Sequence, residues 1–373
     1  TSRTHKMSQT KVEAPFVDNN SVRFKNLLIN ADMNIAQRAT SAASITSGGY
    51  YNIDRWRADV INAGTWTLSQ STTVPDGQGF FYSQKWDCTT ADGSLASADR
   101  VFFEQRIEDQ NCVYLKKGTS SALSTTASFW VRSNKTGTYI CELYDSQNSR
   151  HINKSYTIDS ADTWEKKIIT FPGDTTGAFA NDSGIGLMIR FWLAGGATYN
   201  SGTLATSWQA NDAADRAVGQ VNLADSTDNE WYVTGVQLEA GDQATDFEHL
   251  PHDVQLTRCL RYYFDLASTG LISSGEPTYI CNCSYWNSGQ VFGFLHFPTV
   301  MRAEPTLTTT NATNTFYAYV DGSGDGLDDL SLNSQSNRAG VMVQNNTDAS
   351  GTGGEAGGLY LNSGKICNFS AEF

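Results

Sequence analysis

The chain has 373 residues, of which 39% are hydrophobic, 12% aromatic and only 17% charged, and its formal net charge is -13. This acidic balance argues against nucleic acid and anionic membrane surfaces as partners, because both are bound by Lys and Arg side chains that replace counterions. The length predicts two domains, or one large domain with an appendage.

The start of the chain differs in character from the rest. Residues 1–25 are polar, contain Pro15 and follow no sustained hydrophobic period, so we expect an extended arm that anchors the protein to its neighbours. The chain shows no secretory signal pattern and no apolar run long enough to insert in a membrane. Its seven Cys are odd in number and scattered, which predicts reduced, buried thiols and folding in a reducing cytoplasm.

Short segments of alternating apolar and polar residues dominate positions 51–238, separated by clusters of Gly, Asn, Asp and Ser. Alternation with a period of two predicts β-strands. The clearest segments are 53–59, 65–70, 100–107, 127–132, 139–144, 166–171, 186–193 and 231–238. Many short strands with turn signals between them are typical of a β-sandwich or jelly roll.

One helix is predicted, at 253–261, where Pro251 precedes Asp253 and a short apolar face follows. A second set of short strands is predicted after it, at 262–264, 279–284, 291–297, 316–320, 340–343 and 365–373. The Gly- and Asn-rich stretch 345–358 reads as loop, and the Gly run at 351–358 as flexible. We therefore expect an all-β protein: a jelly-roll β-sandwich over 26–250, then a second, smaller β-sandwich-like domain over 251–373.

A series of short motifs runs in order along most of the chain. They are Asn26-Leu-Leu-Ile-Asn30 with Gln37-Arg38, Ile53-Asp-Arg-Trp56, Glu104-Gln-Arg-Ile107, Ser128-Phe-Trp-Val-Arg132, Val233-Thr-Gly-Val-Gln-Leu-Glu239 with Phe247-Glu248, Cys259-Leu-Arg-Tyr-Tyr263 and Met301-Arg-Ala-Glu-Pro305. In these motifs the chain resembles tailed-bacteriophage tail-fibre and virion surface proteins that carry a carbohydrate-binding-module-like jelly roll. Leu250 and His252 depart from that pattern, so the domain junction is expected to pack differently.

The resemblance implies a non-enzymatic virion surface protein of the tail-fibre or receptor-binding type, which attaches to a host-surface glycan. It also implies a homotrimer that contacts other virion proteins through the N-terminal arm. The protein would fold in the host cytoplasm and reside on the tail or capsid surface of the virion. The resemblance specifies neither the host nor the glycan.

Alternation along three predicted strands, 127–132, 139–144 and 186–193, suggests a carbohydrate site. On the first strand, the side chains of Phe129 and Val131 point to one face and those of Trp130 and Arg132 to the other, and the other two strands divide in the same manner. If the three strands belong to one sheet, its outer face displays Trp130, Arg132, Glu142, Tyr144, Arg190 and Trp192. Indoles stack on sugar rings, and guanidinium and carboxylate groups bind hydroxyls. The same residues also suit half-buried packing or a subunit interface, and both alternatives stay open.

Recognised patterns of catalytic and metal-binding residues are missing from the sequence. There is no Gly-x-Ser-x-Gly elbow and no phosphate-binding Gly-rich loop, and only five His are present. Residues 321–329 have the spacing of half a calcium loop, but Leu332 replaces the expected Glu, so we predict a solvated hairpin loop and no metal or cofactor. Two other functions are considered: a head-decoration or tail-assembly protein, and a glycan depolymerase with paired carboxylates.

Overall fold

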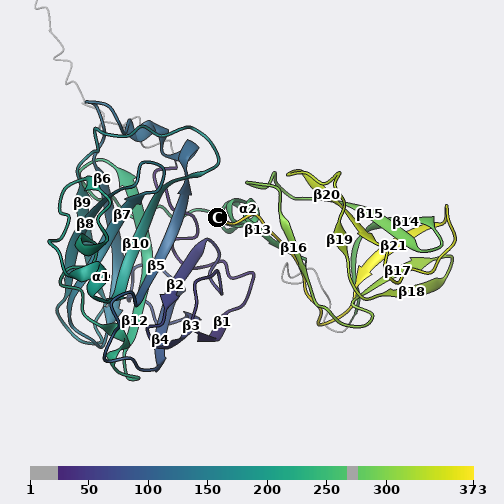
Figure 1. Cartoon of the computed structure of the whole chain (residues 1–373), viewed down its shortest axis with the longest axis horizontal. Helices are drawn as coiled ribbons and strands as arrows, with labels where there is room; N and C mark the ends of the chain where they lie inside the picture. Colours follow the sequence, from purple (N-terminus) through teal and green to yellow (C-terminus); the bar gives the residue numbers. More distant parts are fainter. Residues whose placement is uncertain (1–23, 267–275) are drawn as a thin grey trace, which may run out of the picture.

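The structure is a computed structural model that describes residues 24–266 and 276–373. Its regular structure is almost entirely antiparallel β-sheet, so the predicted all-β class is confirmed. The chain forms two bodies joined at a narrow waist, where the C-terminus also lies (Figure 1). The predicted anchoring arm, 1–25, lies outside the described residues except for Phe24 and Lys25.

Two six-stranded sheets form the N-terminal sandwich. Its strands are β1 (Ser41–Ile45), β2 (Trp56–Ile61), β3 (Thr65–Ser71), β4 (Ser83–Thr90), β5 (Arg100–Glu108), β6 (Thr125–Ser133), β7 (Gly137–Asp145), β8 (Arg150–Ile158), β9 (Glu165–Phe171), β10 (Ile185–Gly195), β11 (Gln209–Ala210) and β12 (Glu230–Ala240). One sheet has the order β1-β3-β4-β12-β6-β9, and we call it the front sheet. The other, called the back sheet, has the order β11-β8-β7-β10-β5-β2.

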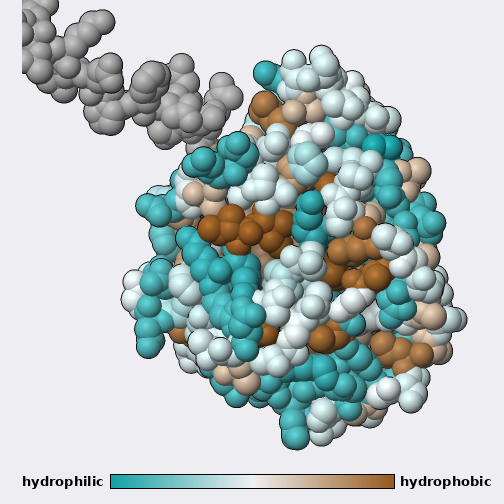
Figure 2. Space-filling view, turned by 90° about the vertical axis from the view of Figure 1, so that its left-hand side faces the viewer, coloured by the Kyte–Doolittle hydropathy of each residue, from teal (hydrophilic) through white to brown (hydrophobic). Residues whose placement is uncertain are grey.

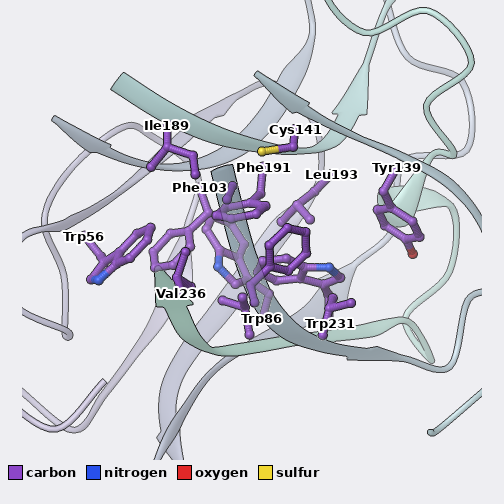
Figure 3. Close-up of a cluster of buried hydrophobic side chains, with 14 of the residues drawn as sticks. Trp56, Trp86, Phe103, Tyr139, Cys141, Ile189, Phe191, Leu193, Trp231 and Val236 are labelled. Carbon is purple, nitrogen blue, oxygen red and sulfur yellow. The ribbon is translucent and has the colours of Figure 1, made fainter. Parts of the chain in front are cut away.

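Aromatic side chains fill the space between the two sheets (Figure 3). Phe103 lies at their centre: its ring stacks on Trp56 with centroids 4.8 Å apart and meets Trp86 and Trp231 edge-on at 5.8 and 6.4 Å. These four side chains are buried, with at most 1% of their surface exposed. The alternation that predicted the strands therefore corresponds to a continuous aromatic core.

A bulge in β12 interrupts its pairing with β6 between Thr234 and Gln237. At this bulge the backbone of Gly235 has a positive φ of 60°, and a Cβ there would lie 2.4 Å from the Phe80 ring. Asn26 binds to the backbone of β12 at this bulge. Its side-chain amide donates to the Val236 carbonyl at 3.0 Å and accepts from the Leu238 backbone N–H at 3.1 Å. A glycine is thus required both by conformation and by close packing.

Replacing Gly235 by Ala should lower the free energy of unfolding of the N-terminal sandwich by about 2–4 kcal/mol, which combines left-handed strain with overpacking against Phe80. Gly77→Ala is the matched control, because Gly77 has a positive φ of 69° in the same sandwich and open space at its Cβ. Urea denaturation measures both variants. Equal losses in the two would show that the Phe80 contact contributes nothing.

The C-terminal domain begins with the predicted helix, α2 (His252–Leu260). Its strands are β13 (Tyr263–Asp265), β14 (Thr278–Asn287), β15 (Gln290–His296), β16 (Thr306–Thr309), β17 (Phe316–Val320), β18 (Ser323–Leu327), β19 (Ser331–Leu332), β20 (Gly340–Asn345), β21 (Ala356–Leu361) and β22 (Cys367–Ser370). They form a three-stranded sheet, β13-β22-β16, and a seven-stranded sheet, β18-β17-β21-β14-β15-β20-β19. A second hydrophobic core, separate from that of the sandwich, lies in this domain. We propose residues 26–250 and 251–373 as the limits of the two domains.

Part of the predicted flexible loop is a strand, so that prediction is wrong from Ala356 onward. Gly357 and Gly358 belong to β21, which pairs with both β14 and β17. A Cβ on Gly357 would lie 1.9 Å from the Tyr319 carbonyl oxygen, so glycine here permits close strand approach. The predicted hairpin at 321–329 is present, with Asp321 and Gly322 in its two-residue turn and β18 as its second arm.

Many of the motif residues meet at the waist between the two bodies. Glu108, fully buried, accepts two hydrogen bonds of 2.7 Å from Arg261 and one from the Tyr262 hydroxyl. Arg55 pairs with Glu372 and lies over the Tyr262 ring, 3.4 Å from its centroid. The motifs therefore describe how the second domain is attached to the first.

Two further predictions concern the whole chain. All seven Cys are unpaired and buried, as the sequence predicted. Over the described ranges, no helix has the length and apolar character required to cross a membrane.

Candidate functional site

The six predicted site residues do not share one surface. Trp130 and Arg132 lie on β6 of the front sheet, whereas the other four lie on β7 and β10 of the back sheet. The predicted single site required all three strands to belong to one sheet, and they do not. Alternation assigned the side chains correctly to non-core faces, but it does not reveal which sheet a strand joins.

Two of the back-sheet candidates, Glu142 and Arg190, belong to a cross-strand row of alternating charge that is buried except at Arg57. Arg57, Glu104, Arg190 and Glu142 are cross-strand neighbours in that order along β2, β5, β10 and β7. Arg190 donates to Glu104 at 2.6 Å and lies 3.6 Å from a Glu142 oxygen. Both carboxylates are fully buried, so the row functions as internal pairing.

Residues 195–222, which contain α1 (Ala197–Asn200), cover this part of the back sheet. Trp192 is fully buried in a small cluster with Phe102, Ile140 and Tyr199, and its indole donates to Glu142 at 3.0 Å. Arg216, from the covering segment, donates to the two oxygens of Glu142 at 2.7 and 2.9 Å. Of the four back-sheet candidates, Glu142, Arg190 and Trp192 are thus parts of the interior.

Tyr144 is half-buried beneath the same guanidinium groups. The Arg190 guanidinium lies 4.5 Å from the centroid of its ring and that of Arg216 lies 5.2 Å from it. Burial alone would raise the pKa of Glu142, but the charges of Arg216 and Arg190 outweigh it and hold that pKa well below its ordinary value. The back-sheet group is therefore a set of satisfied cation–π and ionic contacts, with none of its carboxylates available to a ligand.

Trp130 and Arg132, by contrast, line an open groove on the front sheet. The groove measures about 460 Å³, and two loops complete it. One wall is the β3–β4 loop and the other the β8–β9 loop; the lining residues are Thr73, Val74, Pro75, Asp76, Trp130, Arg132, Asp162, Thr163 and Trp164. We call it the tryptophan groove.

Arg132 holds the β8–β9 loop in place. Its guanidinium donates to the Asp162 carbonyl at 2.9 Å and to the Asp162 carboxylate at 2.8 Å. It also lies 4.9 Å from the centroid of the Tyr232 ring, against which Trp164 packs edge-on at 6.2 Å. Trp164 is thereby fixed beside the outer face of β6, while its indole N–H finds no hydrogen-bond acceptor among the residues described.

The groove has the chemistry of a sugar-binding surface. Its volume lies in the range of small-molecule sites, which is roughly 300–1,000 Å³. Two indoles and the Pro75 ring offer apolar faces for stacking, and Asp76, Asp162 and Arg132 offer acceptors and donors for hydroxyls. Trp164 and the loop at Thr73–Asp76 had no signal in the sequence, because loops far apart in the chain form these walls.

One side of the sandwich, the side of β6, β8 and β9 in Figure 1, faces the viewer in Figure 2. Hydrophobic residues there form several small groups separated by polar ones, with no single continuous apolar area (Figure 2). Isolated apolar groups of this kind are common on protein surfaces. This face therefore gives no indication of a large hydrophobic protein interface.

The part of the chain that the structure describes shows no candidate metal site. No group of three or more His, Cys, Asp or Glu side chains within it is arranged to hold a metal ion. The groove contains two carboxylates, Asp76 and Asp162, and the second is engaged by Arg132. This pair is the feature of the groove that bears on the glycan-cleaving alternative.

No protein-family model matches the chain, and no curated protein matches it. Solved structures with some likeness include the enzymatically active domain of tailspike protein 4 of bacteriophage CBA120, at 12% identity and a TM-score of 0.31. That match covers 58% of this chain and 21% of the tailspike chain.

Carbohydrate-binding modules also appear among the similar structures. TmCBM61 in complex with β-1,4-galactotriose matches at 9% identity and a TM-score of 0.29, over 58% of this chain and 99% of its own. The family 11 module from Clostridium thermocellum, in complex with a β-1,3-1,4-mixed-linked tetrasaccharide, matches at 12% identity and a TM-score of 0.26, over 55% and 98%. TM-scores this low identify neither a ligand nor an activity for this chain.

Proposed function

We propose that this chain is a phage-type virion surface protein that attaches to a host-surface glycan and binds it in the tryptophan groove without cleaving it. The observation that carries the proposal is the pairing of Trp130 and Trp164 with Arg132 and Asp162 in one open groove. The motifs of tail-fibre proteins support the virion part of the proposal, since they run in order from Asn26 to Pro305.

A homotrimer is part of the same proposal, and so are contacts with other virion proteins through residues 1–25. Three grooves on one particle would strengthen attachment to a dense glycan surface, because linked sites raise the effective concentration of each next contact. Light scattering on the purified protein should give a mass near three times 40.8 kDa. A monomeric mass at all concentrations would remove the multivalent part of the proposal.

Trp130→Ala and Trp164→Ala should each weaken glycan binding by at least about tenfold, the loss of roughly 1.4 kcal/mol or more expected for a central stacking contact. The glycan is found on an array, and its affinity is then measured by titration calorimetry with the soluble oligosaccharide, so that avidity does not mask the loss. Phe81→Ala is the matched control, since Phe81 is 76% exposed and lies outside the groove lining. Folded Trp variants that keep full affinity would exclude the tryptophan groove as the site.

Glycan cleavage is the second candidate, and the presence of Asp76 and Asp162 in one groove is the observation that favours it. Glycoside hydrolysis commonly uses two carboxylates on either side of the scissile bond. Incubation of the bound glycan with the protein should release no new reducing ends. Release that Asp76→Asn or Asp162→Asn abolishes would establish catalysis instead.

A structural role in head decoration or tail assembly is the third candidate. Exposed aromatic side chains on the C-terminal domain favour it, because such residues are common in protein interfaces. A protein of this kind would bind neither array glycans nor cells, and removing those aromatics would change its assembly state.

A further inference from the structure

The outer face of the seven-stranded sheet carries an unusual number of exposed aromatic side chains. Trp286 on β14 is 71% exposed, Tyr279 50%, Tyr319 46% and Phe294 40%. Single exposed aromatic side chains are common on protein surfaces, but several on one sheet face indicate a surface that contacts another molecule. The strands that carry them, β14, β15 and β17, belong to the body on the right of Figure 1.

One end of this face is hollowed into a groove of about 280 Å³, separate from the tryptophan groove. Trp286 and Phe292 form its aromatic side, with ring centroids 6.3 Å apart and the planes at 60°. Four amide side chains form the rest, together with Met342: Gln290, Asn333, Gln335 and Gln344. We call it the amide groove.

The amides are partly organised by one another. The side-chain oxygen of Gln344 accepts from Asn333 at 2.8 Å and from Gln290 at 3.4 Å. Within the described chain, the Gln344 side-chain nitrogen and the Gln290 side-chain oxygen form no hydrogen bond. The groove therefore presents positioned donors and acceptors beside an indole.

Every residue that lines the amide groove is uncharged. An anionic ligand would lose its hydration there without gaining a cationic partner, which is unfavourable. Uncharged sugars suit it: hydroxyls both donate and accept hydrogen bonds, as amides do, and the apolar face of a sugar ring can cover Trp286.

We propose that the amide groove is a second carbohydrate site and that it binds an uncharged oligosaccharide, with one ring stacked on Trp286. This goes beyond the function proposed above, because the site lies in the other domain and favours uncharged ligands over charged ones. A second copy of the chain is the competing occupant, and the experiment below separates the two.

The experiment follows quenching of tryptophan fluorescence by acrylamide in the full chain, and because the chain has nine Trp, the contribution of Trp286 is taken as the difference between the wild type and Trp286→Ala. Cellotriose, maltotriose, β-1,4-galactotriose and triacetylchitotriose are the uncharged probes, and sialyllactose is the charged comparison. At least one uncharged probe should reduce quenching clearly more in the wild type than in Trp286→Ala, and sialyllactose should show a far smaller difference between the two proteins. Affinity for that probe should fall at least tenfold in Trp286→Ala and about threefold in Gln335→Ala.

Tyr319→Ala is the matched control, an exposed aromatic on the same sheet face outside the groove lining, and it should bind as the wild type does. The inference is overturned if no uncharged probe protects Trp286. It is equally overturned if Trp286→Ala lowers the oligomeric mass and leaves sugar binding intact, since the groove would then be an interface between copies.

The two proposals can fail separately. Trp130→Ala should leave the protection of Trp286 unchanged, because the tryptophan groove lies on a different domain. Binding lost only in Trp130→Ala would support the tryptophan groove and remove the amide groove. Binding lost only in Trp286→Ala would do the reverse.

Discussion

Replacing Glu108 by Ala should lower the free energy of unfolding by about 3–5 kcal/mol and cause the two domains to unfold separately. Its carboxylate is fully buried at the waist and accepts from Arg261, Tyr262 and Gln110. Alanine would leave the Arg261 charge and the Tyr262 hydroxyl without their acceptor. Breaking a buried pair by removing one partner is among the most damaging single changes.

Differential scanning calorimetry checks this prediction through the number of transitions. The wild type should unfold in one transition, or in two that overlap closely, and Glu108→Ala in two that are well separated. Glu165→Ala is the control, because Glu165 pairs with Lys167 on β9, away from the waist. One unsplit transition at an unchanged temperature in Glu108→Ala would show that the domains are coupled by other contacts.

The strands that the sequence revealed include β6, whose two faces differ, and also β10 and β12, which are buried on both faces. On β6, Phe129 and Val131 enter the core while Trp130 and Arg132 face outward, so the alternation is plain. On β8, Lys154 interrupts the apolar series of Ile152, Tyr156 and Ile158, so that three polar residues follow one another at positions 153 to 155. Alternation is recognised where apolar residues occupy every second position without a break, so β8 was missed.

The motifs predicted attachment between elements better than they predicted a ligand. Gln105 exchanges two hydrogen bonds with the backbone of Ile29, at 2.7 and 2.8 Å, and Gly235 forms the bulge to which Asn26 binds. These residues come from separate motifs, and they contact each other within the protein. The motifs therefore describe how the sandwich and the waist are built.

The candidate site was predictable only in part. Parity alone identified Trp130 and Arg132 as outward-facing, and both line the tryptophan groove. It could not exclude Trp192, because the cover that buries this indole comes from a segment without periodicity. Nor could it find Trp164, or Trp286 and Gln344 of the amide groove, since each groove depends on loops or strands that approach only in the folded chain.

Glu142→Gln should destabilise the N-terminal sandwich by about 3 kcal/mol at pH 7, because Arg216 loses the only carboxylate with which it pairs among the described residues, and Arg190 loses one of two. His151 also faces this site, with its Nδ1 3.7 Å from a Glu142 oxygen. The folded-state pKa of Glu142 lies below the value near 4.3 expected when unfolded, so the ionised form stabilises the fold above that pH. That stabilisation is lost as the pH falls through the folded-state pKa.

The difference in unfolding free energy between wild type and Glu142→Gln should therefore be largest at pH 7 and shrink from about pH 4 towards pH 2. Urea denaturation across this range measures it, and Asp242→Asn, which changes an exposed carboxylate, should show almost no difference at any pH. A gap between wild type and Glu142→Gln that stays constant down to pH 2 would mean that the charge of Glu142 is not what holds the covering segment. The loss would then come from packing around Trp192, whose indole donates to the same carboxylate.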